Sequence, residues 1–447
     1  EISLLNTGTN NHWSPGYNKL FFDKITYQPI INTGWNEYGP KRINVGQSNV
    51  TNILESKYNT STHSSVCGAI DTVWTHPSDS NIIIIGAVGG GIWKTTNAKN
   101  SGDYIVWENK SDEKGLVIRH ICSDINNSDR LVACTGHSSS YLVGQWSADP
   151  NKGVLVSTDG GENWVQKRII VNGKTLSLDL SSVVCWGNKI LTASHRFGIN
   201  NTSGLTSNDI YGGLYLSTDF GNSWVQSTNS TQLSSSNIYD YQITSLEITK
   251  IGDNIILYAG LLTSGVYKST DEGVSWNNIS SSTGFMNNSL SLTTNNNLLI
   301  SACRDHPEVV YVIIVNQGRS TVMAYTTDSG LTWNEMNLPK TFDIQGTAHY
   351  LHPMTEKDGT PKVNGKSGSQ GAIHLALYAH PTNSNIVYAG GDRQPEIGGI
   401  LQVDSWTARL FRGDRSKSST NLSTLGYSDQ WSHITNTNTI TDRSKYG

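Results

Sequence analysis

The sequence predicts an all-β fold built from repeated four-stranded units. Three observations lead to this prediction: an octapeptide occurs four times, each copy follows a short apolar run, and the spacing between copies is nearly constant. The copies occupy residues 157–164, 217–224, 269–276 and 326–333. Their Asp residues lie 60, 52 and 57 positions apart (219−159, 271−219, 328−271). Self-similarity at a period of this size is the signature of a repeat architecture.

The octapeptide reads Ser/Thr-Thr-Asp-x-Gly-x-x-Trp and is called the octapeptide turn below. A strand before it and a Trp at the start of the next strand predict a β-hairpin. The Asp carboxylate can accept backbone N–H groups of its own turn, and the Gly two residues later can adopt a positive φ. The Trp would bury a large apolar surface between neighbouring sheets. We therefore expect structural rather than catalytic roles for Asp159, Trp164, Asp219, Trp224, Asp271, Trp276, Asp328 and Trp333.

This pattern resembles the Asp-box (BNR) repeat of the sialidase-like β-propellers, a superfamily that includes sialidases, xyloglucanases, sortilin-type receptors and photosystem assembly factors. The resemblance implies a β-propeller of four-stranded antiparallel blades. It does not imply one activity, because enzymes and non-enzymes share the repeat.

The strand pattern shows six blades, and continuous apolar runs such as 82–85 predict strands buried on both faces. The first and last blades carry degenerate octapeptides that end at Trp107 and Trp431. We expect seven blades in the complete ring, closed by an N-terminal strand or by sequence beyond this chain. The expected domains are an irregular segment and ring-closing strand at 1–50, the propeller at 51–435, and a tail or further blade at 436–447.

Length and charge narrow the function. A propeller of six to eight blades is one closed unit of about this length, 447 residues. The net charge of −4 argues against a nucleic-acid partner. The apolar runs are too short for a membrane-spanning helix, so we expect no membrane insertion. The chain starts at Glu1, as a mature secreted chain or a piece of a longer protein would. We expect a secreted or cell-surface location.

The cysteines do not form a recognisable disulfide framework. All five lie in apolar runs typical of strands, which favours buried thiols that pack as small hydrophobic groups. Cys122 and Cys134 could pair, because they lie on predicted neighbouring strands. Neither a metal site nor a cofactor-binding motif is predicted by the spacings.

The order of strands sorts the loops by face. If the strands of each blade are A to D from the axis outward, the octapeptide turns join C to D and lie on the same face as the A–B turns. The B–C loops lie on the opposite face, and long loops on one face of a rigid scaffold carry binding residues. The candidate binding residues in these loops are His137, Tyr141, Trp146, His195, Arg196, Arg319, Asp392 and Arg393. The alternative is that Asp392 and Arg393 brace their own loop and that the His residues are solvated.

Three functions remain open. A sialidase-like enzyme needs the Phe-Arg-Ile-Pro motif, which is absent here. A xyloglucanase-like enzyme needs two carboxylates across a cleft, and residues 86–91 contain no acid where that family commonly reads Thr-Asp-Val-Gly-Gly. Asp71 and Asp392 could face the channel, but nothing in the sequence pairs them. We therefore expect an extracellular module that binds a glycan or a protein, with a glycoside hydrolase or a structural subunit of a surface filament, adhesin or array as alternatives.

Overall fold

The structure of the chain is a computed structural model. The described residues are 70–88, 90–99, 105–111, 117–136, 153–176, 178–197, 213–227, 243–262, 265–280, 295–316, 319–342, 348–350, 375–393, 408–419 and 429–434. Within them there is no α-helix, and so no helix able to span a membrane. The predicted boundaries near 50 and 435 lie outside the described residues.

The described strands form six four-stranded antiparallel sheets, as the sequence predicts, and these are blades 1 to 6. Blade 1 holds β1 (Ile70–Thr75), β2 (Ile83–Ala87), β3 (Gly91–Thr95) and β4 (Glu108–Asn109); blade 2 holds β5 (Ile118–Asp124), β6 (Asn127–Thr135), β7 (Val154–Ser157) and β8 (Val165–Lys167); blade 3 holds β11 (Leu178–Trp186), β12 (Lys189–Phe197), β13 (Gly213–Ser217) and β14 (Val225–Gln226). Blade 4 holds β15 (Ile243–Ile251), β16 (Asn254–Leu261), β17 (Gly265–Ser269) and β18 (Asn277–Asn278); blade 5 holds β19 (Asn295–Ala302), β20 (Val310–Asn316), β21 (Arg319–Thr326) and β22 (Asn334–Met336); blade 6 holds β25 (Ala376–Ala379), β26 (Ile386–Arg393), β27 (Ala408–Asp414) and β28 (Trp431–His433).

Two small hairpins lie outside the blades. They are formed by β9 (Ile170–Val171) with β10 (Lys174–Thr175), and by β23 (Lys340–Phe342) with β24 (Ala348–Tyr350). Each follows the outer strand of a blade, blade 2 in the first case and blade 5 in the second.

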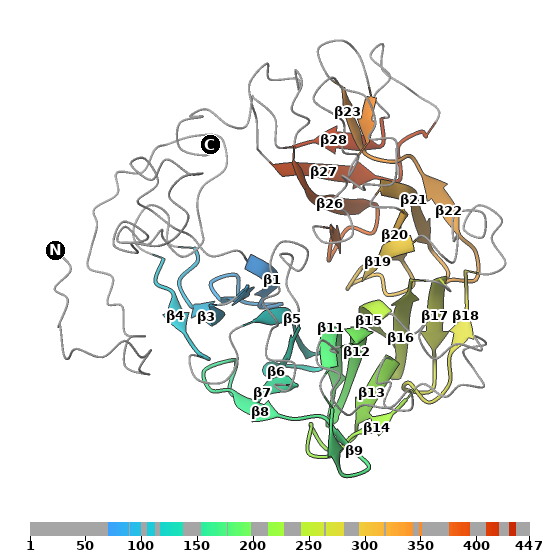
Figure 1. The fold of residues 1–447 in the computed structure, drawn as a ribbon. Coiled ribbons are helices and arrows are strands. Elements are labelled where there is room, and N and C mark those ends of the chain that lie inside the picture. Colours follow the sequence, from blue (N-terminus) through green and yellow to red (C-terminus); the bar gives the residue numbers. More distant parts are fainter. Residues whose placement is uncertain are drawn as a thin grey trace, which may run out of the picture.

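The blades follow one another around a common axis (Figure 1). The first strand of each blade lies toward the axis and the last strand lies at the rim. Among the described strands, each blade packs against the next from blade 1 to blade 6, but blades 6 and 1 form no comparable contact. The described blades therefore make an arc, and a seventh blade stays a prediction.

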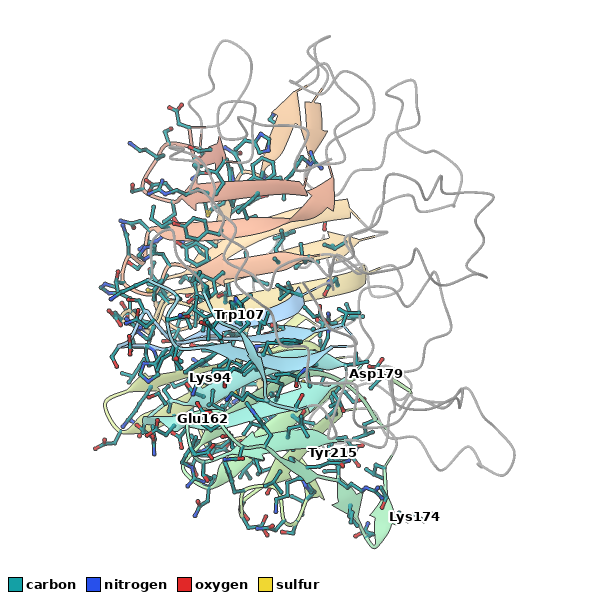
Figure 2. The ribbon with its side chains drawn as sticks, turned by 90° about the vertical axis from the view of Figure 1, so that its left-hand side faces the viewer. Lys94, Trp107, Glu162, Lys174, Asp179 and Tyr215 are labelled. Carbon is teal, nitrogen blue, oxygen red and sulfur yellow. The ribbon has the colours of Figure 1, made fainter. Side chains whose placement is uncertain are left out.

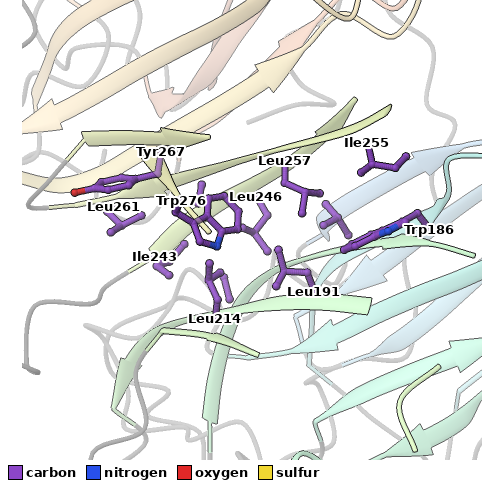
Figure 3. Packing of buried hydrophobic residues seen from close by; sticks show 13 residues of the cluster. Trp186, Leu191, Leu214, Ile243, Leu246, Ile255, Leu257, Leu261, Tyr267 and Trp276 are labelled. Atoms are coloured by element: carbon purple, nitrogen blue, oxygen red, sulfur yellow. The ribbon is translucent and has the colours of Figure 1, made fainter. Parts of the chain in front are cut away.

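The hydrophobic core is divided into clusters that lie between neighbouring blades. The cluster between blades 3 and 4 joins Leu191 and Leu214 to Leu246, Leu257 and Trp276 (Figure 3). This arrangement explains the continuous apolar runs, because both faces of a blade are covered by neighbouring sheets.

The octapeptide turns share one hydrogen-bond pattern. The hydroxyl of the first residue accepts the N–H of the Gly, as in the 3.0 Å bond from Gly161 to Ser157. The Asp Oδ1 accepts the N–H four residues later, at 2.9 Å in the first copy and 2.8 Å in the other three. The four Gly residues have φ values of 86°, 89°, 88° and 88°. Burial opposes ionisation of Asp159, but bonds from Asn163 and Ser157 outweigh it and lower the pKa of Asp159 to about 2.

Each Trp of the octapeptide turn is buried, with Trp164 fully covered and Trp333 6 % exposed. The Trp164 Nε1–H donates to the carbonyl of Gly161 at 3.1 Å, so the ring is fixed by its own turn. In the fourth copy, Trp333 instead donates to the carbonyl of Ile279 in the preceding blade at 3.0 Å. These residues fasten the turn to the interface between blades.

Lysines fasten the octapeptide turns to the preceding blade. The contacts are Lys94 to Glu162 at 2.5 Å, Lys110 to Glu162 at 2.7 Å, Lys167 to Asn222 at 2.7 Å, Lys189 to Glu272, and Lys268 to the carbonyl of Ser329 at 2.8 Å. We call them the lysine clasps. Lys94 and Glu162 lie together on the face of the octapeptide turns, which is called the turn face (Figure 2).

A second set of bonds joins the innermost strands. At each junction, a polar side chain on one blade lies against a backbone N–H of the next. The pairs are Thr72 with Ile121 (3.4 Å), His120 with Val183 (3.3 Å), Ser182 with Leu246 (3.2 Å), Ser245 with Ile300 (3.1 Å) and Ser301 with Ala379 (2.9 Å). We call this set the inner belt. It ties blades 1 to 6 together around the axis.

Candidate binding site

The structure places five of the predicted binding residues at the ends of strands. His195 and Arg196 belong to β12, Arg319 begins β21, and Asp392 and Arg393 end β26. The sequence predicts loops at these five positions, and the prediction is wrong for their backbones. The ladders continue past the apolar runs, since pairing such as Asp392 opposite Arg409 needs no apolar side chain. His137, Tyr141 and Trp146 lie outside the described residues.

These five residues nonetheless share one face of the molecule. They lie where the second strand of a blade ends or the third begins, which is the end opposite the octapeptide turns. This face is called the site face. The first strand of each blade starts on it, so the beginnings of the inner strands surround the axis there.

The inner strands start with a repeated irregularity on the site face. In blades 1, 2, 4 and 5, one residue near the start of the inner strand is skipped by the register with the second strand. The skipped residues are Asp71, Arg119, Thr244 and Asn296. A β-bulge of this kind re-aims a side chain, and bulges are frequent next to functional sites.

Two of the bulged residues form an ion pair across blades 1 and 2. Arg119 Nη1 donates to both oxygens of Asp71, at 2.8 and 2.9 Å. The Asp71 side chain is 10 % exposed and that of Arg119 is 27 % exposed. The pair is thus largely withdrawn from water, and part of the Arg119 side chain stays exposed.

A second acid, Asp179, approaches the same guanidinium from blade 3. It is buried in β11, and its backbone pairs with Arg196. Burial lowers the pKa of Arg119, but the charges of Asp71 and then Asp179 outweigh this and raise it. Figure 2 shows Asp179 on the side of the molecule away from Lys94 and Glu162. We call Asp71, Arg119 and Asp179 the acid–arginine cluster.

This cluster can bind oxygen-rich groups. Guanidinium offers five N–H donors in a rigid plane, whereas carboxylates only accept hydrogen bonds. An arginine that is held by one carboxylate and is partly exposed can donate its remaining N–H groups to hydroxyl, carbonyl or carboxylate oxygens of a ligand. The bulges at Asp71 and Arg119 give the cluster a fixed geometry.

Another carboxyl group near the axis has different chemistry. Burial raises the pKa of Glu247 in β15 to about 8, so this group is protonated at neutral pH. Glu247 lies three residues beyond Thr244, which is ~10 Å farther along the strand at about 3.3 Å per residue. It therefore lies deeper toward the turn face than the acid–arginine cluster.

The His-Pro pairs lie at A–B turns, on the turn face, as predicted. His76 Nδ1 accepts the N–H of Asp79 at 3.0 Å, and His380 Nδ1 accepts the N–H of Asn383 at 3.1 Å. Arg304 and Asp305 form an ion pair at 2.8 Å. These residues stabilise their own turns.

The described cysteines are free thiols. The proposed pairing of Cys122 with Cys134 is not seen, because Cys122 lies opposite Val132 and Cys134 lies opposite His120 in the ladder. In the part of the chain that the structure describes, no group of three or more His, Cys, Asp or Glu side chains is arranged to hold a metal ion.

Sequence reasoning missed Arg119 and Asp179. Both occupy the second position of an inner strand, as Asp71 does. Alignment of the inner strands by that position would have brought the three charges together. Their separation in sequence, 48 residues between Asp71 and Arg119, concealed the ion pair.

No protein-family model matches the chain, and no curated protein matches it in sequence. Solved structures do resemble it. The GH74 enzyme of Niastella koreensis is 14% identical with a TM-score of 0.49, and the GH74 xyloglucanase of Xanthomonas campestris is 14% identical with a TM-score of 0.47; the match covers 82% of this chain and 45% of each enzyme. YCF48 from Cyanidioschyzon merolae is 12% identical with a TM-score of 0.43, over 81% of this chain and 87% of that one. The chain thus spans less than half the length of the two enzymes, and at these identities the likeness concerns the fold alone.

Proposed function

We propose that this chain is a secreted or cell-surface propeller of the Asp-box, sialidase-like type that binds a glycan on its site face. The observation that carries the proposal is the acid–arginine cluster at the start of the inner strands. Bulges at Asp71 and Arg119 lie at the start of the inner strands beside the axis, and the Arg119 side chain is 27 % exposed.

A glycan suits this chemistry. Sugar hydroxyl groups both donate and accept hydrogen bonds, so a carboxylate and a guanidinium side by side satisfy neighbouring hydroxyls. Tyr141 and Trp146, which the sequence analysis assigns to a loop of this face, would stack on sugar rings. His195, Arg196, Arg319, Asp392 and Arg393, whose backbones lie at this face, stay candidate binding residues.

Binding without hydrolysis is the favoured form of this function. Hydrolysis of a glycosidic bond needs two carboxyl groups on either side of it, one of them acting as an acid. Asp71 is instead paired with Arg119, the charge of Asp179 raises the pKa of the same arginine, and both carboxylate side chains are largely buried. Glu247, the described carboxyl group with a raised pKa of about 8, lies deeper along its strand.

A protein partner is the second candidate, and a different observation favours it. Ile70 is 46 % exposed and Val73 59 % exposed on the inner strand of blade 1, and Tyr378 is 55 % exposed on that of blade 6. Exposed apolar groups of this kind anchor protein partners. A larger protein or surface array containing this chain would use the same surface.

A glycan array and a hydrolysis assay on the same sugars test the proposal. Wild-type protein should bind a subset of glycans without turnover. Arg119→Lys, which keeps the charge but loses the planar fork, should weaken binding about tenfold or more. Arg304→Ala is the matched control, because it removes an arginine that pairs with an aspartate on the turn face, and it should bind as the wild type does.

Three results would overturn the assignment. Turnover of a bound sugar would establish a hydrolase. Equal binding by Arg119→Lys and wild type would show that the glycan does not bind at the acid–arginine cluster. The double variant Asp392→Ala, Arg393→Ala would then be the next test. Failure of folded wild-type protein to bind any glycan would refute the glycan proposal and favour the protein partner.

A further inference from the structure

Two thiols face each other across the junction of blades 2 and 3. Cys122 Sγ in β5 lies 3.8 Å from Cys185 Sγ in β11. From this juxtaposition we propose that Cys122 and Cys185 are the site of a disulfide bond that joins the inner strands of neighbouring blades. The inference is independent of any ligand on the site face.

The backbone around the two thiols is already held together. His120 and Val183 are in contact at 3.3 Å through the inner belt, and each stands two residues before one of the cysteines. Sulfur atoms in a disulfide lie about 2.05 Å apart, so the gap must close by roughly 1.8 Å. Rotation of the two side chains about their Cα–Cβ bonds can supply this movement while the strands stay in place.

The other described thiols have different neighbours. Cys134 is fully buried and lies opposite His120 in the ladder of blade 2. Cys303 Sγ donates to the carbonyl of His380 at 3.1 Å. Among the described cysteines, Cys122 and Cys185 are therefore the pair in which one thiol meets another.

The reaction is a thiol–disulfide exchange with a low-molecular-weight disulfide such as glutathione disulfide. The thiolate of Cys122, the less buried of the two, attacks one sulfur of the oxidant and releases the first glutathione. The thiolate of Cys185 then attacks Cys122 Sγ and releases the second. The two protein thiols lose two protons and two electrons, and the oxidant becomes two molecules of glutathione.

The solvent access and the ionisation of the Cys122 thiol set the rate of the exchange reaction. The hydrogen bond to Cys185 and then burial raise the pKa of the Cys122 thiol. Since the thiolate is the nucleophile, exchange in the folded protein should be slow at pH 7 and faster at pH 9. Oxidation during folding, before the blades pack, avoids this barrier, as expected for a protein made in an oxidising compartment.

The test uses the full chain, refolded with a mixture of reduced and oxidised glutathione and then treated with an alkylating reagent. Peptide mapping without reduction should show a peptide from β5 linked to one from β11, lighter by two hydrogens. The midpoint of urea unfolding should be higher for this material than after dithiothreitol treatment. Cys122→Ser should abolish both effects, and the matched control Cys134→Ser should keep both.

Two outcomes would overturn the proposal. One is full alkylation of Cys122 and Cys185 in protein refolded under oxidising conditions. The other is a linked peptide that joins Cys122 to Cys134 or to another cysteine. If Cys122→Ser fails to fold, Cys185→Ser provides the same comparison, and the peptide map of the wild type decides by itself.

Discussion

Replacement of Ser182 by alanine tests whether the inner belt stabilises the propeller. The Ser182 hydroxyl accepts the N–H of Leu246 at 3.2 Å, across the junction of blades 3 and 4. Both residues are buried, at 5 % and 3 % exposure. In Ser182→Ala, the backbone N–H of Leu246 loses this hydrogen-bond acceptor at a buried position where water has little access. A buried donor left without a partner costs ~1–3 kcal/mol.

The chain offers a matched control in Ser320. This serine is also buried, in β21, but its hydroxyl has no hydrogen-bond partner in the structure. Ser320→Ala removes the same atom without breaking a bond, so its effect on stability should be near zero or slightly favourable. The two substitutions differ in the contacts of the Ser182 hydroxyl, which are the bond to Leu246 of blade 4 and a longer contact of 3.5 Å with His120 Nδ1 of blade 2.

Equilibrium unfolding in urea, followed by tryptophan fluorescence, measures the difference. We expect the free energy of unfolding to fall by about 2 kcal/mol in Ser182→Ala relative to Ser320→Ala, which is about a 30-fold change in the ratio of folded to unfolded protein. Equal midpoints for the two variants would refute the stabilising role of the belt. A larger loss in Ser320→Ala would show that hydroxyl volume, not the bond, matters.

Three further predictions concern the ionisation of two buried groups and a steric contact at a glycine. Burial raises the pKa of Glu247 to about 8 in the folded protein, against about 4.3 in the unfolded chain, so stability is lost as the pH rises between these values. Glu247→Gln should therefore stabilise the protein by on the order of 3 kcal/mol at pH 7.5 and little at pH 4.5. Equal gains in stability at both pH values would contradict this prediction. Burial lowers the pKa of His120 to about 4, so the folded state excludes a proton that the unfolded state takes up; stability should fall from pH 6.5 to pH 4, and His120→Asn should flatten this slope in urea titrations. A Cβ at Gly330 would come within 2.4 Å of Ile279, whereas at Gly273 the nearest atom is 3.5 Å away, and φ is 88° at both glycines. Gly330→Ala should therefore lower the free energy of unfolding by ~1–3 kcal/mol more than Gly273→Ala. Equal thermal midpoints of the two variants would show that the side chain of Ile279 moves aside freely.

The sequence predicted the parts of the fold that depend on nearby residues. The octapeptide turns, the buried Trp164 and its counterparts, and the six blades follow from patterns within about 60 residues. The inner belt, the lysine clasps and the acid–arginine cluster depend on the register between neighbouring blades. No local pattern fixes that register, so Arg119 and Asp179 were missed.

The cysteines show the same limit. The sequence favours buried thiols and leaves open a pairing of Cys122 with Cys134, because the two lie on predicted neighbouring strands. Pairing brings Cys134 opposite His120 instead, and the described thiol that Cys122 meets comes from the next blade, 63 residues away. In a propeller, a side chain on the face of a sheet meets the adjacent blade rather than its own hairpin partner. The backbones of Arg196 and Asp392 were predicted as loops for a related reason. The strands that carry these two residues extend beyond their apolar runs.

The lysine clasps differ from one junction to the next between blades 1 and 5. The octapeptide turns are nearly interchangeable in backbone, yet the side chains at their variable positions differ: Glu162, Asn222 and Glu272 meet different lysines of the preceding blade. In the fourth turn, Lys268 meets the backbone carbonyl of Ser329 instead. A chain of similar repeats risks pairing blade 2 with blade 4 or exchanging a blade with another molecule. Mismatched neighbours would leave a lysine facing the wrong group. At the first three of these junctions, the side chains at the variable positions therefore favour the native neighbour over a mismatched one.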